Sequence, residues 1–222
     1  MEAVKNVKDG SVIGLGSGST VAYAISELGR RIKMEELRVL GVPASYKTFL
    51  LAVEHGVPIT TLNEHPNLDL DIDGADQIDE ELNLIKGMGG ALTREKIVAA
   101  ASKILIIIAD ETKLTSNLGE NQPLPVEVLP FALPLVTTRI REMGGKPKLR
   151  ERKDGSGPYV TDNGNFILDV DFGVIKDPLS LDEDLKQIPG VIETGLFIGM
   201  AEKAYIGTMR DVKIIERNKT EH

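Results

Sequence analysis

The segment 86–96 combines residue types that could bind a small anionic substrate and place a carboxylate at the same site. Lys86 supplies a positive charge, and three of the next four residues are glycines, which let backbone N–H groups approach a ligand closely. A helix is expected to begin near Thr93, which suits the N-cap, and its first turn adds unpaired N–H groups and a partial positive charge. Glu95 then lies in that first turn, either as a functional carboxylate of the site or as a carboxylate that only offsets the helix dipole.

A second glycine-rich segment, 11–20, indicates a phosphate-binding turn between a strand and a helix. A short apolar run breaks into alternating glycines and hydroxyls, and apolar residues at helical spacing follow. The dinucleotide fingerprint fails because Ser19 occupies its third glycine position, and the Walker A pattern fails because no lysine precedes Ser19 or Thr20. The hydroxyls of Ser17, Ser19 and Thr20 suit a single phosphate, with an ordinary tight turn as the alternative.

The acidic segment 69–81 matches the calcium-loop pattern of an EF-hand at Asp69, Asp71, Asp73, Gly74 and Glu80. An EF-hand needs a helix on each side, whereas here apolar residues alternate with aspartates, as in a strand. The strand interpretation puts Asp73 and Asp76 at or beyond the strand's end, where carboxylates meet a ligand at the carboxyl edge of a parallel sheet. A merely solvated acidic turn is the other alternative.

Taken together, these segments resemble the type A ribose-5-phosphate isomerase family, and the resemblance covers nearly the whole chain. No single motif is decisive, but their order and spacing are highly specific. The matching motifs occupy residues 16–20, 73–76, 86–96, 123–128, 160–165 and 188–191.

This resemblance implies reversible isomerisation of D-ribose 5-phosphate and D-ribulose 5-phosphate, in the non-oxidative branch of pentose phosphate metabolism. The reaction needs a base that takes the C2 proton and returns it at C1 through an enediolate, and groups that stabilise the developing oxyanion. Glu95 matches the family's proton-abstracting glutamate and Lys86 its active-site lysine, while Asp73 and Asp76 match its paired aspartates. The matching substrate-binding positions are Ser17, Gly18, Ser19, Thr20, Asp73, Gly74, Ala75, Asp76, Lys86, Gly87, Met88 and Gly89.

The chain departs from the family's usual residues at four positions. Ser17 stands where threonine is frequent, Gln77 where glutamate is common, and Met88 where glycine is common. Glu120 stands where many relatives carry a substrate-contacting lysine, and Lys113 is the nearest upstream candidate to replace it. These changes keep the four expected catalytic groups.

Composition excludes several classes of site and partner. The 222 residues contain no cysteine, which excludes disulfides and thiolate metal sites, and the three histidines lack zinc-ligand spacing, so no metal and no cofactor are expected. No apolar run is long enough for a membrane span and no secretory signal is apparent, which favours a cytoplasmic protein without membrane partners. The net charge of −8 disfavours nucleic-acid binding. A basic concentration at 139–153 is interpreted as a solvated helix face and strand edge, or as a subunit interface.

The expected fold is α/β, with a Rossmann-like, doubly wound, mainly parallel sheet and a smaller ferredoxin-like α+β domain. The first domain is assigned to 1–123 plus 200–222, with strands at 11–15, 37–42, 68–73 and 103–109 and helices at 19–32, 45–55 and 93–102. The second, 124–199, reads strand, helix, strand, strand, helix, strand and is a candidate for oligomer contacts. Residues 212–215 return as a strand to the first domain, and the polar tail 218–222 is expected to fray.

Two other functions share parts of these motifs. A noncatalytic sugar-phosphate sensor could use the same binding loops, although no helix-turn-helix segment precedes the first strand. A coenzyme A transferase-like enzyme would use a glutamate as nucleophile rather than as base. The combination of Asp73, Asp76, Lys86 and Glu95 favours the isomerase, with a small sugar phosphate as substrate. The protein is expected to be a homodimer or homotetramer, because the family that it resembles is oligomeric.

Overall fold

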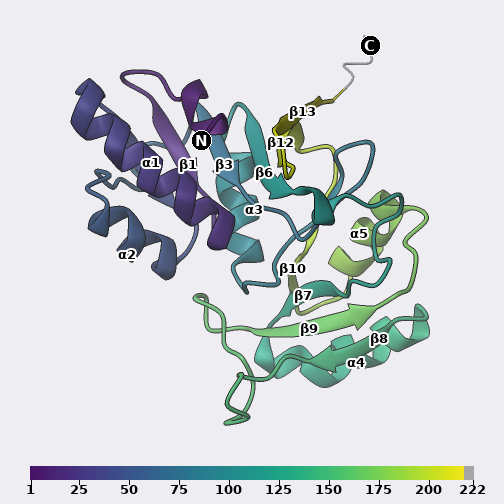
Figure 1. Cartoon of the computed structure of the whole chain (residues 1–222). Coiled ribbons are helices and arrows are strands. Elements are labelled where there is room, and N and C mark those ends of the chain that lie inside the picture. The colour runs from purple at the N-terminus through teal and green to yellow at the C-terminus, as the bar shows by residue number, and fades with distance from the viewer. Residues whose placement is uncertain (218–222) are drawn as a thin grey trace. The chain divides into compact units, whose positions relative to one another are not determined.

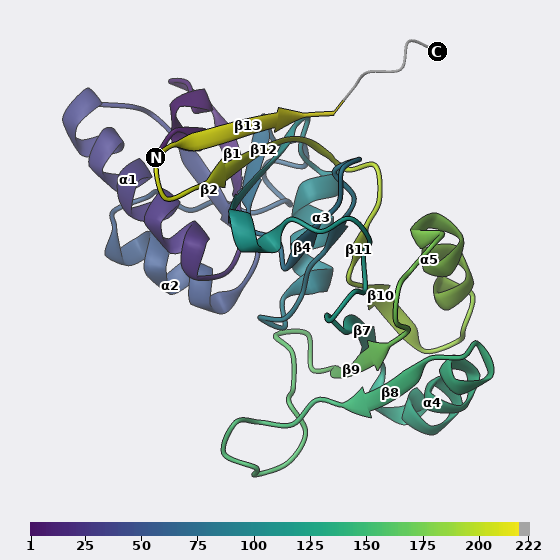
Figure 2. The same ribbon diagram turned by 45° about the vertical axis from the view of Figure 1, so that its right-hand side comes forward.

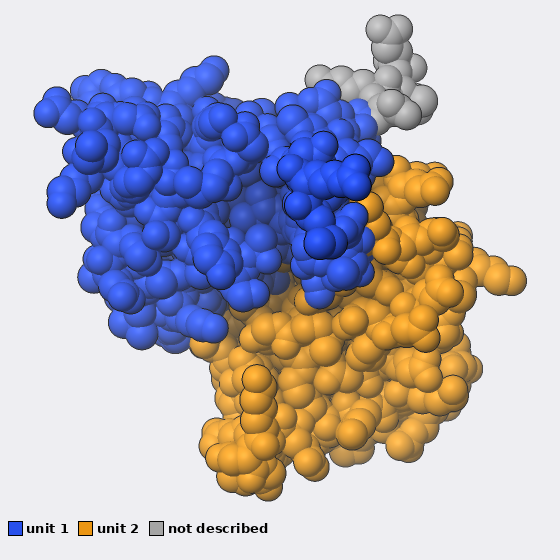
Figure 3. Space-filling model, in the orientation of Figure 1, with its two compact units in different colours: residues 1–75, 94–113, 199–222 blue, residues 76–93, 114–198 orange. Residues whose placement is uncertain are grey.

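A computed structural model describes residues 1–217, and its chain divides into two compact units (Figures 1 and 3). Unit 1 comprises Met1–Ala75, Arg94–Lys113 and the segment from Gly199, and unit 2 comprises Asp76–Thr93 and Leu114–Ile198. The expected fraying of the tail 218–222 lies outside the described residues.

Unit 1 is built on a six-stranded sheet in the order β13-β12-β6-β3-β1-β2. All its neighbouring strands are parallel except β12 and β13, which are antiparallel. The strands are β1 (Val12–Leu15), β2 (Leu40–Pro43), β3 (Leu70–Asp73), β6 (Leu105–Asp110), β12 (Ala201–Gly207) and β13 (Val212–Glu216). The helical elements are η1 (Ala3–Asn6), α1 (Ser19–Glu35), α2 (Tyr46–Glu54), α3 (Leu92–Ala100), of which the first two residues group with unit 2, and η2 (Glu111–Lys113).

The alternation of side chains along β1 sorts the helices onto two faces of this sheet. Ile13 and Leu15 belong to the core cluster that contains the apolar face of α1, whereas Val12 packs in the cluster that contains Val98 of α3. A Cβ on Gly14 would meet Val98 as well. Helices α1 and α2 lie side by side (Figures 1 and 2). The sheet is therefore covered on both faces, as a parallel sheet requires.

The order of the strands creates a topological switch point between β1 and β3. The chain leaves β1 through α1 toward β2 on one side, and leaves β3 through α3 toward β6 on the other. The carboxyl ends of these two neighbouring parallel strands are Leu15 and Asp73. Open α/β sheets bind ligands in the crevice at such a point.

Unit 2 contains a four-stranded antiparallel sheet in the order β10-β7-β9-β8. Its elements follow the expected order strand, helix, strand, strand, helix, strand. They are β7 (Leu124–Val128), η3 (Pro130–Ala132), α4 (Leu133–Glu142), β8 (Lys146–Leu149), β9 (Phe166–Asp171), α5 (Pro178–Lys186) and β10 (Val191–Thr194). Buried residues of β7, β9 and both helices form one core. This is the ferredoxin-like pattern, so the predicted fold class is confirmed.

A second, three-stranded antiparallel sheet changes the expected domain boundary. It consists of β4 (Gln77–Ile78), β5 (Leu84–Ile85) and β11 (Leu196–Phe197) in the order β11-β5-β4. Ile85 also packs in the core of unit 2. For these reasons 76–93 and 114–123 group with unit 2, where the sequence analysis had assigned 1–123 to the first domain. Long-range strand pairing, which periodicity does not reveal, caused this difference.

Most individual elements lie within a few residues of their expected positions. The strand predicted at 68–73 is confirmed at residues 70–73 by β3, a fully buried strand paired with β1 and β6, which excludes the helix-flanked EF-hand. The strand at 212–215 is confirmed by β13. Strand β12 was missed, although it lies between β6 and β13. Among residues 1–217, no helix is long and apolar enough to cross a membrane.

Candidate functional site

Asp73 and Ser17, two of the expected substrate-binding residues, meet at the switch point of unit 1. Asp73 is the last residue of β3 and is fully buried. Its Oδ1 accepts hydrogen bonds from the backbone N–H of Ser17 (3.0 Å) and from its neighbour Gly74 (2.7 Å). The turn after β1 is tied to β3 as well, since Gly16 N–H donates to the carbonyl of Ile72 (3.0 Å). The Asp73 carboxylate is thus held in a fixed orientation by backbone donors.

Gly16 is required by the closeness of this approach. A Cβ at position 16 would lie 2.0 Å from Asp73 Oδ1 and 2.5 Å from Asp73 Cβ. These separations are far below van der Waals contact, so any larger residue would displace the carboxylate or the turn. The glycine that signalled a phosphate turn in the sequence therefore also makes room for an aspartate.

The hydroxyl of Ser17 is oriented by the start of α2. Ser17 Oγ lies 2.9 Å from Ser45 Oγ and 3.1 Å from Thr48 Oγ1. Ser45 caps α2 by accepting from Thr48 N–H (3.0 Å), and Thr48 Oγ1 donates to the carbonyl of Gly16 (2.8 Å). The sequence analysis did not connect these residues with the turn, although a serine before a helical stretch is an N-cap signal.

The first turn of α1 remains the part of this loop best suited to an anion. Gly18 is the N-cap with φ of 114°, a conformation that favours glycine. Backbone N–H groups in the first helical turn have no intrahelical acceptor, and they carry a partial positive charge. Gly18 and Ser19 are exposed and Thr20 is half-buried. The predicted substrate-binding turn therefore presents donors to solvent at the switch point.

Glu95 lies in the first turn of α3 and is 4% exposed. Helix α3 begins at Leu92, so Thr93 is inside the helix rather than at its N-cap, and Glu95 is its fourth residue rather than its second. The Thr93 hydroxyl donates to Glu127 Oε2 (2.5 Å) instead of capping the helix. This corrects the expected helix start but keeps Glu95 in the first turn.

Lys86 is held at the end of β5 in unit 2 and is 2% exposed. Its backbone N–H donates to the carbonyl of Gly195 (2.9 Å), which lies just before β11. Its Nζ lies 5.2 Å from the ring centroid of the buried Phe197, at the distance of a cation–π contact. A buried ammonium of this kind is a point charge in a low-dielectric setting, where it acts strongly on a nearby anion.

Asp76 contacts the glycine loop that follows Lys86. Its backbone N–H donates to the carbonyl of Ile85 (2.8 Å), and its Oδ2 accepts from the N–H of Met88 (2.9 Å). Asp76 is half-buried, whereas Met88 and Gly89 are exposed. The structure therefore brings Asp76 together with residues 86–89 in unit 2, as it brings Asp73 together with Ser17 in unit 1. Gly74 and Ala75 continue from Asp73 in unit 1.

Arg150 also fixes the glycine loop, a role that the sequence analysis missed. Its Nη1 donates to the carbonyls of Gly87 (2.9 Å) and Met88 (3.1 Å). Its Nε donates to Asp169 Oδ2 (2.9 Å), and its Nη2 donates to the other oxygen of Asp169. The side chain of Arg150 is 11% exposed, so the interpretation of the basic segment as solvated is wrong at this position.

Tyr159 adds a second contact to the same loop. Its hydroxyl donates to the carbonyl of Gly89 (3.3 Å), and a Cβ on Gly90 would lie 2.4 Å from that hydroxyl oxygen. Burial raises the pKa of the Tyr159 hydroxyl above its ordinary value, which keeps the group protonated as a donor. Position 90 is therefore glycine because a tyrosine occupies the space.

Gln77, one of the departures from the family pattern, joins the start of β4 to the loop that contains Glu120. Its Nε2 donates to the carbonyl of Glu120 (2.7 Å), and its Oε1 accepts from the N–H of Gly119 (2.8 Å). Only an amide can donate and accept in this way, since an ionised carboxylate has no donor. The Glu120 side chain itself is exposed. Gln77 thus has a structural role, because its amide holds the backbone of the loop at Gly119 and Glu120.

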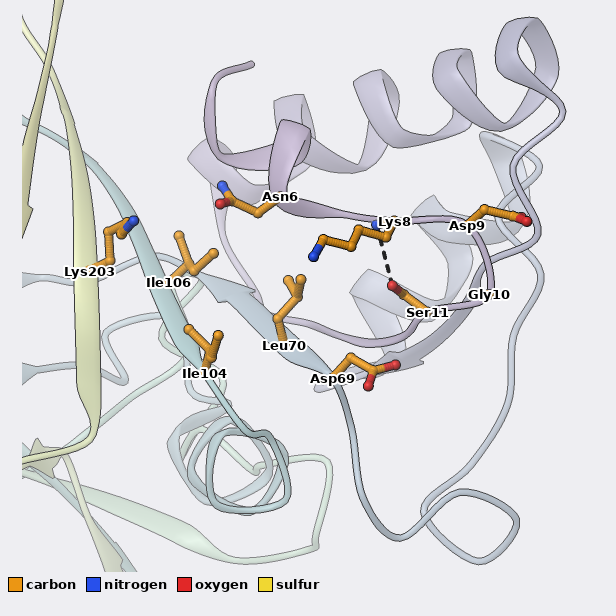
Figure 4. Close-up of a pocket in the computed structure, with 10 residues that line it drawn as sticks. All are labelled: Asn6, Lys8, Asp9, Gly10, Ser11, Asp69, Leu70, Ile104, Ile106 and Lys203. Carbon is orange, nitrogen blue, oxygen red and sulfur yellow. Dashed lines mark hydrogen bonds between the residues drawn. The ribbon is translucent and has the colours of Figure 1, made fainter.

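The largest pocket described within unit 1 lies at the opposite, amino end of the strands (Figure 4). Leu70, Ile104 and Ile106 form its apolar part (Figure 4). Its charged side chains are largely neutralised, because Asp69 pairs with Lys103 and Lys203 pairs with Glu216. This pocket has a volume of about 550 Å³ but no concentration of charge, so the switch point remains the candidate site.

Within residues 1–217, no group of three or more histidine, cysteine or carboxylate side chains is arranged to hold a metal ion. A doubly wound sheet with a glycine turn and a fixed aspartate at its switch point, joined to a ferredoxin-like unit, defines an α/β protein equipped to bind a small anion.

Comparison with known proteins identifies the particular family. The sequence model of ribose 5-phosphate isomerase A (phosphoriboisomerase A) matches residues 40–211, and the chain belongs to this family. A relative named ribose-5-phosphate isomerase A from Methanosarcina acetivorans is 54% identical over 214 residues, which cover 96% of this chain and 90% of the relative.

Two solved structures of the family have the same fold. Ribose 5-phosphate isomerase A from Methanocaldococcus jannaschii is 46% identical, with a TM-score of 0.94 over 97% of this chain and 95% of that one. A D-ribose-5-phosphate isomerase in complex with phospho-erythronic acid is 45% identical, with a TM-score of 0.95 and the same coverage.

Proposed function

We propose that this protein is a ribose-5-phosphate isomerase, which interconverts D-ribose 5-phosphate and D-ribulose 5-phosphate in the non-oxidative branch of pentose phosphate metabolism. Its membership of the ribose 5-phosphate isomerase A family carries the proposal. The solved relative in complex with phospho-erythronic acid, a phosphorylated sugar acid, supports a sugar phosphate as ligand.

Glu95 is the base of the proposed reaction. It takes the proton from C2 of the opened sugar, the C2–H electron pair becomes the C1–C2 double bond of an enediolate, and the same proton returns at C1. The transfer moves a hydroxyl proton from O2 to O1, so that C2 becomes the carbonyl carbon. The burial of Glu95 supports this role, since a base shielded from water does not lose its proton to solvent.

Lys86, Asp73 and Asp76 complete the proposed catalytic set. The buried ammonium of Lys86 stabilises the negative charge that develops on the enediolate oxygen. Asp73 and Asp76 hold the sugar hydroxyls and assist ring opening and the transfer of hydroxyl protons. The backbone bonds that orient both carboxylates support this role, because a proton shuttle needs a fixed position.

The phosphate of the substrate is assigned to the turn 17–20 and the first turn of α1. Gly18 and Ser19 are exposed, and the first-turn N–H groups of α1 supply donors without a full charge, which suits a dianion held away from the reacting carbons. Gly74, Ala75, Gly87, Met88 and Gly89 are assigned to the substrate through their backbone groups.

The decisive experiment is ribulose 5-phosphate formation from ribose 5-phosphate in EDTA, with Glu95→Gln measured beside the wild type. We expect turnover in the wild type and a loss of roughly a thousandfold or more in the variant, in line with removal of a general base. Calorimetric binding of the sugar phosphate should persist in Glu95→Gln, because the phosphate contacts remain. Activity that depends on added metal would contradict the metal-independent mechanism.

Inactive wild type would redirect the assignment. Sugar-phosphate binding without turnover would indicate the sensor, and a covalent thioester at Glu95 after incubation with acyl-coenzyme A would indicate the transferase. A homodimer or homotetramer and a cytoplasmic location stay predictions, as does the residue that replaces the family's lysine near Glu120.

A further inference from the structure

Glu127 is a fully buried carboxylate for which the proposed isomerase chemistry has no use. It lies in β7, the strand of unit 2 that pairs with both β10 and β9. A buried ionised carboxylate is costly unless several donors replace its water shell. The structure provides four side-chain donors, and they divide between its two oxygens.

Three of these donors come from one tight turn and converge on Oε1. They are the Thr161 hydroxyl (2.9 Å) and the amides of Asn163 (3.1 Å) and Asn165 (2.8 Å). Thr161 also organises the turn, since its Oγ1 accepts from the backbone N–H groups of Asn163 (3.2 Å) and Asn165 (3.1 Å). This turn is the motif at 160–165 and Glu127 belongs to the motif at 123–128, so the two motifs form one structure.

The fourth donor comes from the helix that carries Glu95. The Thr93 hydroxyl donates to Oε2 at 2.5 Å, on the carboxylate oxygen that the turn does not use. Thr93 and Glu95 both lie in the first turn of α3. Helix ends fray because their first N–H groups lack intrahelical partners. A side-chain bond to a rigid sheet therefore restrains the turn that carries the base.

We propose that Glu127 is a positioning residue, which uses Oε1 to hold the turn 161–165 and Oε2 to hold Thr93, and so fixes the orientation of Glu95. This proposal rests on the proposed function, because it assigns Glu127 to the base of that reaction. Glu127 touches no substrate and acts through Thr93.

Three features favour this arrangement over a purely structural one. The carboxylate is immobile, because three donors hold one oxygen from a turn anchored beside β9. Its other oxygen is reserved for Thr93. Finally, a carboxylate accepts from every direction that these donors use, whereas an amide would place its NH₂ toward one set of them. Glu127→Gln should retain part of the restraint on Thr93, because the Thr93 hydroxyl can accept a hydrogen bond from that NH₂.

The test compares Thr93→Val with Thr93→Ser and with Thr161→Val in the full-length protein. Thr93→Val removes the bond at nearly constant volume, and Thr93→Ser restores the hydroxyl. We expect kcat of Thr93→Val to fall roughly ten- to hundredfold with KM changed by less than about twofold, since small displacements of a catalytic group have costs of this order. Thr93→Ser should recover most of the rate.

Thr161→Val is the control for stability. It disrupts the turn but leaves Thr93 and Oε2 in place, so it should lower the melting temperature more than Thr93→Val while lowering kcat less. Amide hydrogen exchange of the folded protein provides a measurement independent of activity: the amides at 95–97 should exchange faster in Thr93→Val than in Thr93→Ser.

The outcomes separate this proposal from the proposed function. Wild-type kcat in Thr93→Val, with Glu95→Gln inactive, would overturn the positioning role and leave the isomerase assignment intact. A kcat that follows melting temperature across all three variants would also overturn it. An active Glu95→Gln would overturn both, because the base itself would then be elsewhere.

Discussion

At the scale of single residues, the switch point depends on the absence of a side chain at position 16, because a Cβ there would displace the Asp73 carboxylate. A Cβ on Gly16 would fall in the space that the Asp73 carboxylate fills, and this aspartate is tied to the turn through Ser17 N–H. The sequence analysis took the glycine as a sign of a phosphate turn. The structure adds that the missing Cβ lets a buried carboxylate stand directly against that turn.

Gly16→Ala should therefore destabilise the protein, whereas Gly74→Ala should be nearly neutral. The first variant forces a Cβ to 2.0 Å from Asp73 Oδ1, while a Cβ at Gly74 would have its nearest neighbour at 3.7 Å. Overpacking of this kind costs about 1–3 kcal/mol. Urea denaturation of both variants measures the difference, and equal stabilities would contradict the described packing at Gly16.

At the scale of elements, the loop 86–90 is defined by side chains that lie far away in the sequence. Arg150 follows β8 and Asp169 lies in β9, and together they hold the Gly87 and Met88 carbonyls. The planar guanidinium supplies several donors in fixed directions, which one ammonium cannot reproduce. The glycine loop thus gains its rigidity from the ferredoxin-like sheet.

Arg150→Lys should consequently lower kcat/KM by roughly tenfold or more, because the carbonyls of the loop lose their common donor and residues 86–88 become mobile. Arg152→Lys is the matched control, since Arg152 is an exposed arginine of the same segment. Steady-state kinetics of both variants test the point. An equal loss of kcat/KM in the two variants would show that a general property of the arginines in this segment is responsible, and not the hydrogen bonds from Arg150 to the loop carbonyls.

At the scale of the whole molecule, paired surface carboxylates should make unit 1 sensitive to acid. Hydrogen bonds from the Arg38 side chain lower the pKa of Asp9 from 3.8 to about 2. The pKa of Asp69 is also lowered, chiefly by its hydrogen bond from Lys103. A carboxyl with a lowered folded-state pKa stabilises the fold above the unfolded value, and this contribution disappears as the pH falls through the folded value.

Asp9→Asn should therefore melt below the wild type at pH 7, and the difference should shrink between pH 4 and pH 2. The reason is that the wild-type carboxyl becomes protonated in this window, after which both proteins lack the ion pair with Arg38. Melting curves by circular dichroism at several pH values measure the effect at low ionic strength. A difference that is constant down to pH 2 would contradict the role of this charge.

The homo-oligomer stays a prediction, and exposed apolar side chains suggest how to test it. One patch follows helical spacing on α2 and the other lies around η3 and α4, and an apolar surface of this kind is typical of an interface. The first consists of Tyr46, Phe49, Leu50 and Val53, and the second of Leu129, Phe131 and Leu135. Phe131 is 93% exposed, the largest value of the seven.

Leu50→Asp and Phe131→Asp should each lower the mass measured by sedimentation equilibrium, as expected for a homotetramer with two interfaces. An effect of only one variant would indicate a homodimer through that patch. Unchanged mass in both would place the interface elsewhere.

The degree to which the sequence predicted this molecule differed between short and long range. Strands β1, β3 and β6, helices α1 to α3 and the order of elements in the ferredoxin-like unit followed from periodicity, glycine turns and caps. Strand β12 was missed because its seven residues show no clear alternation of buried and exposed side chains. Only its pairing with β6 identifies it as a strand. The start of α3 was also misplaced, because the helix begins at Leu92 and the Thr93 hydroxyl donates to Glu127 instead of accepting an N-cap hydrogen bond.

By itself, the sequence determined the class of the fold, the motifs of the family and the identity of the chemical groups, because these depend on residue type and local spacing. Only the tertiary structure decided that Asp73 stands where Gly16 lacks a side chain, that the half-buried Arg150 donates to the carbonyls of the glycine loop, and that the motifs at 123–128 and 160–165 meet at one carboxylate. Such meetings join residues dozens of positions apart. These contacts depend on burial and hydrogen bonding in the folded core, and local propensity does not predict them.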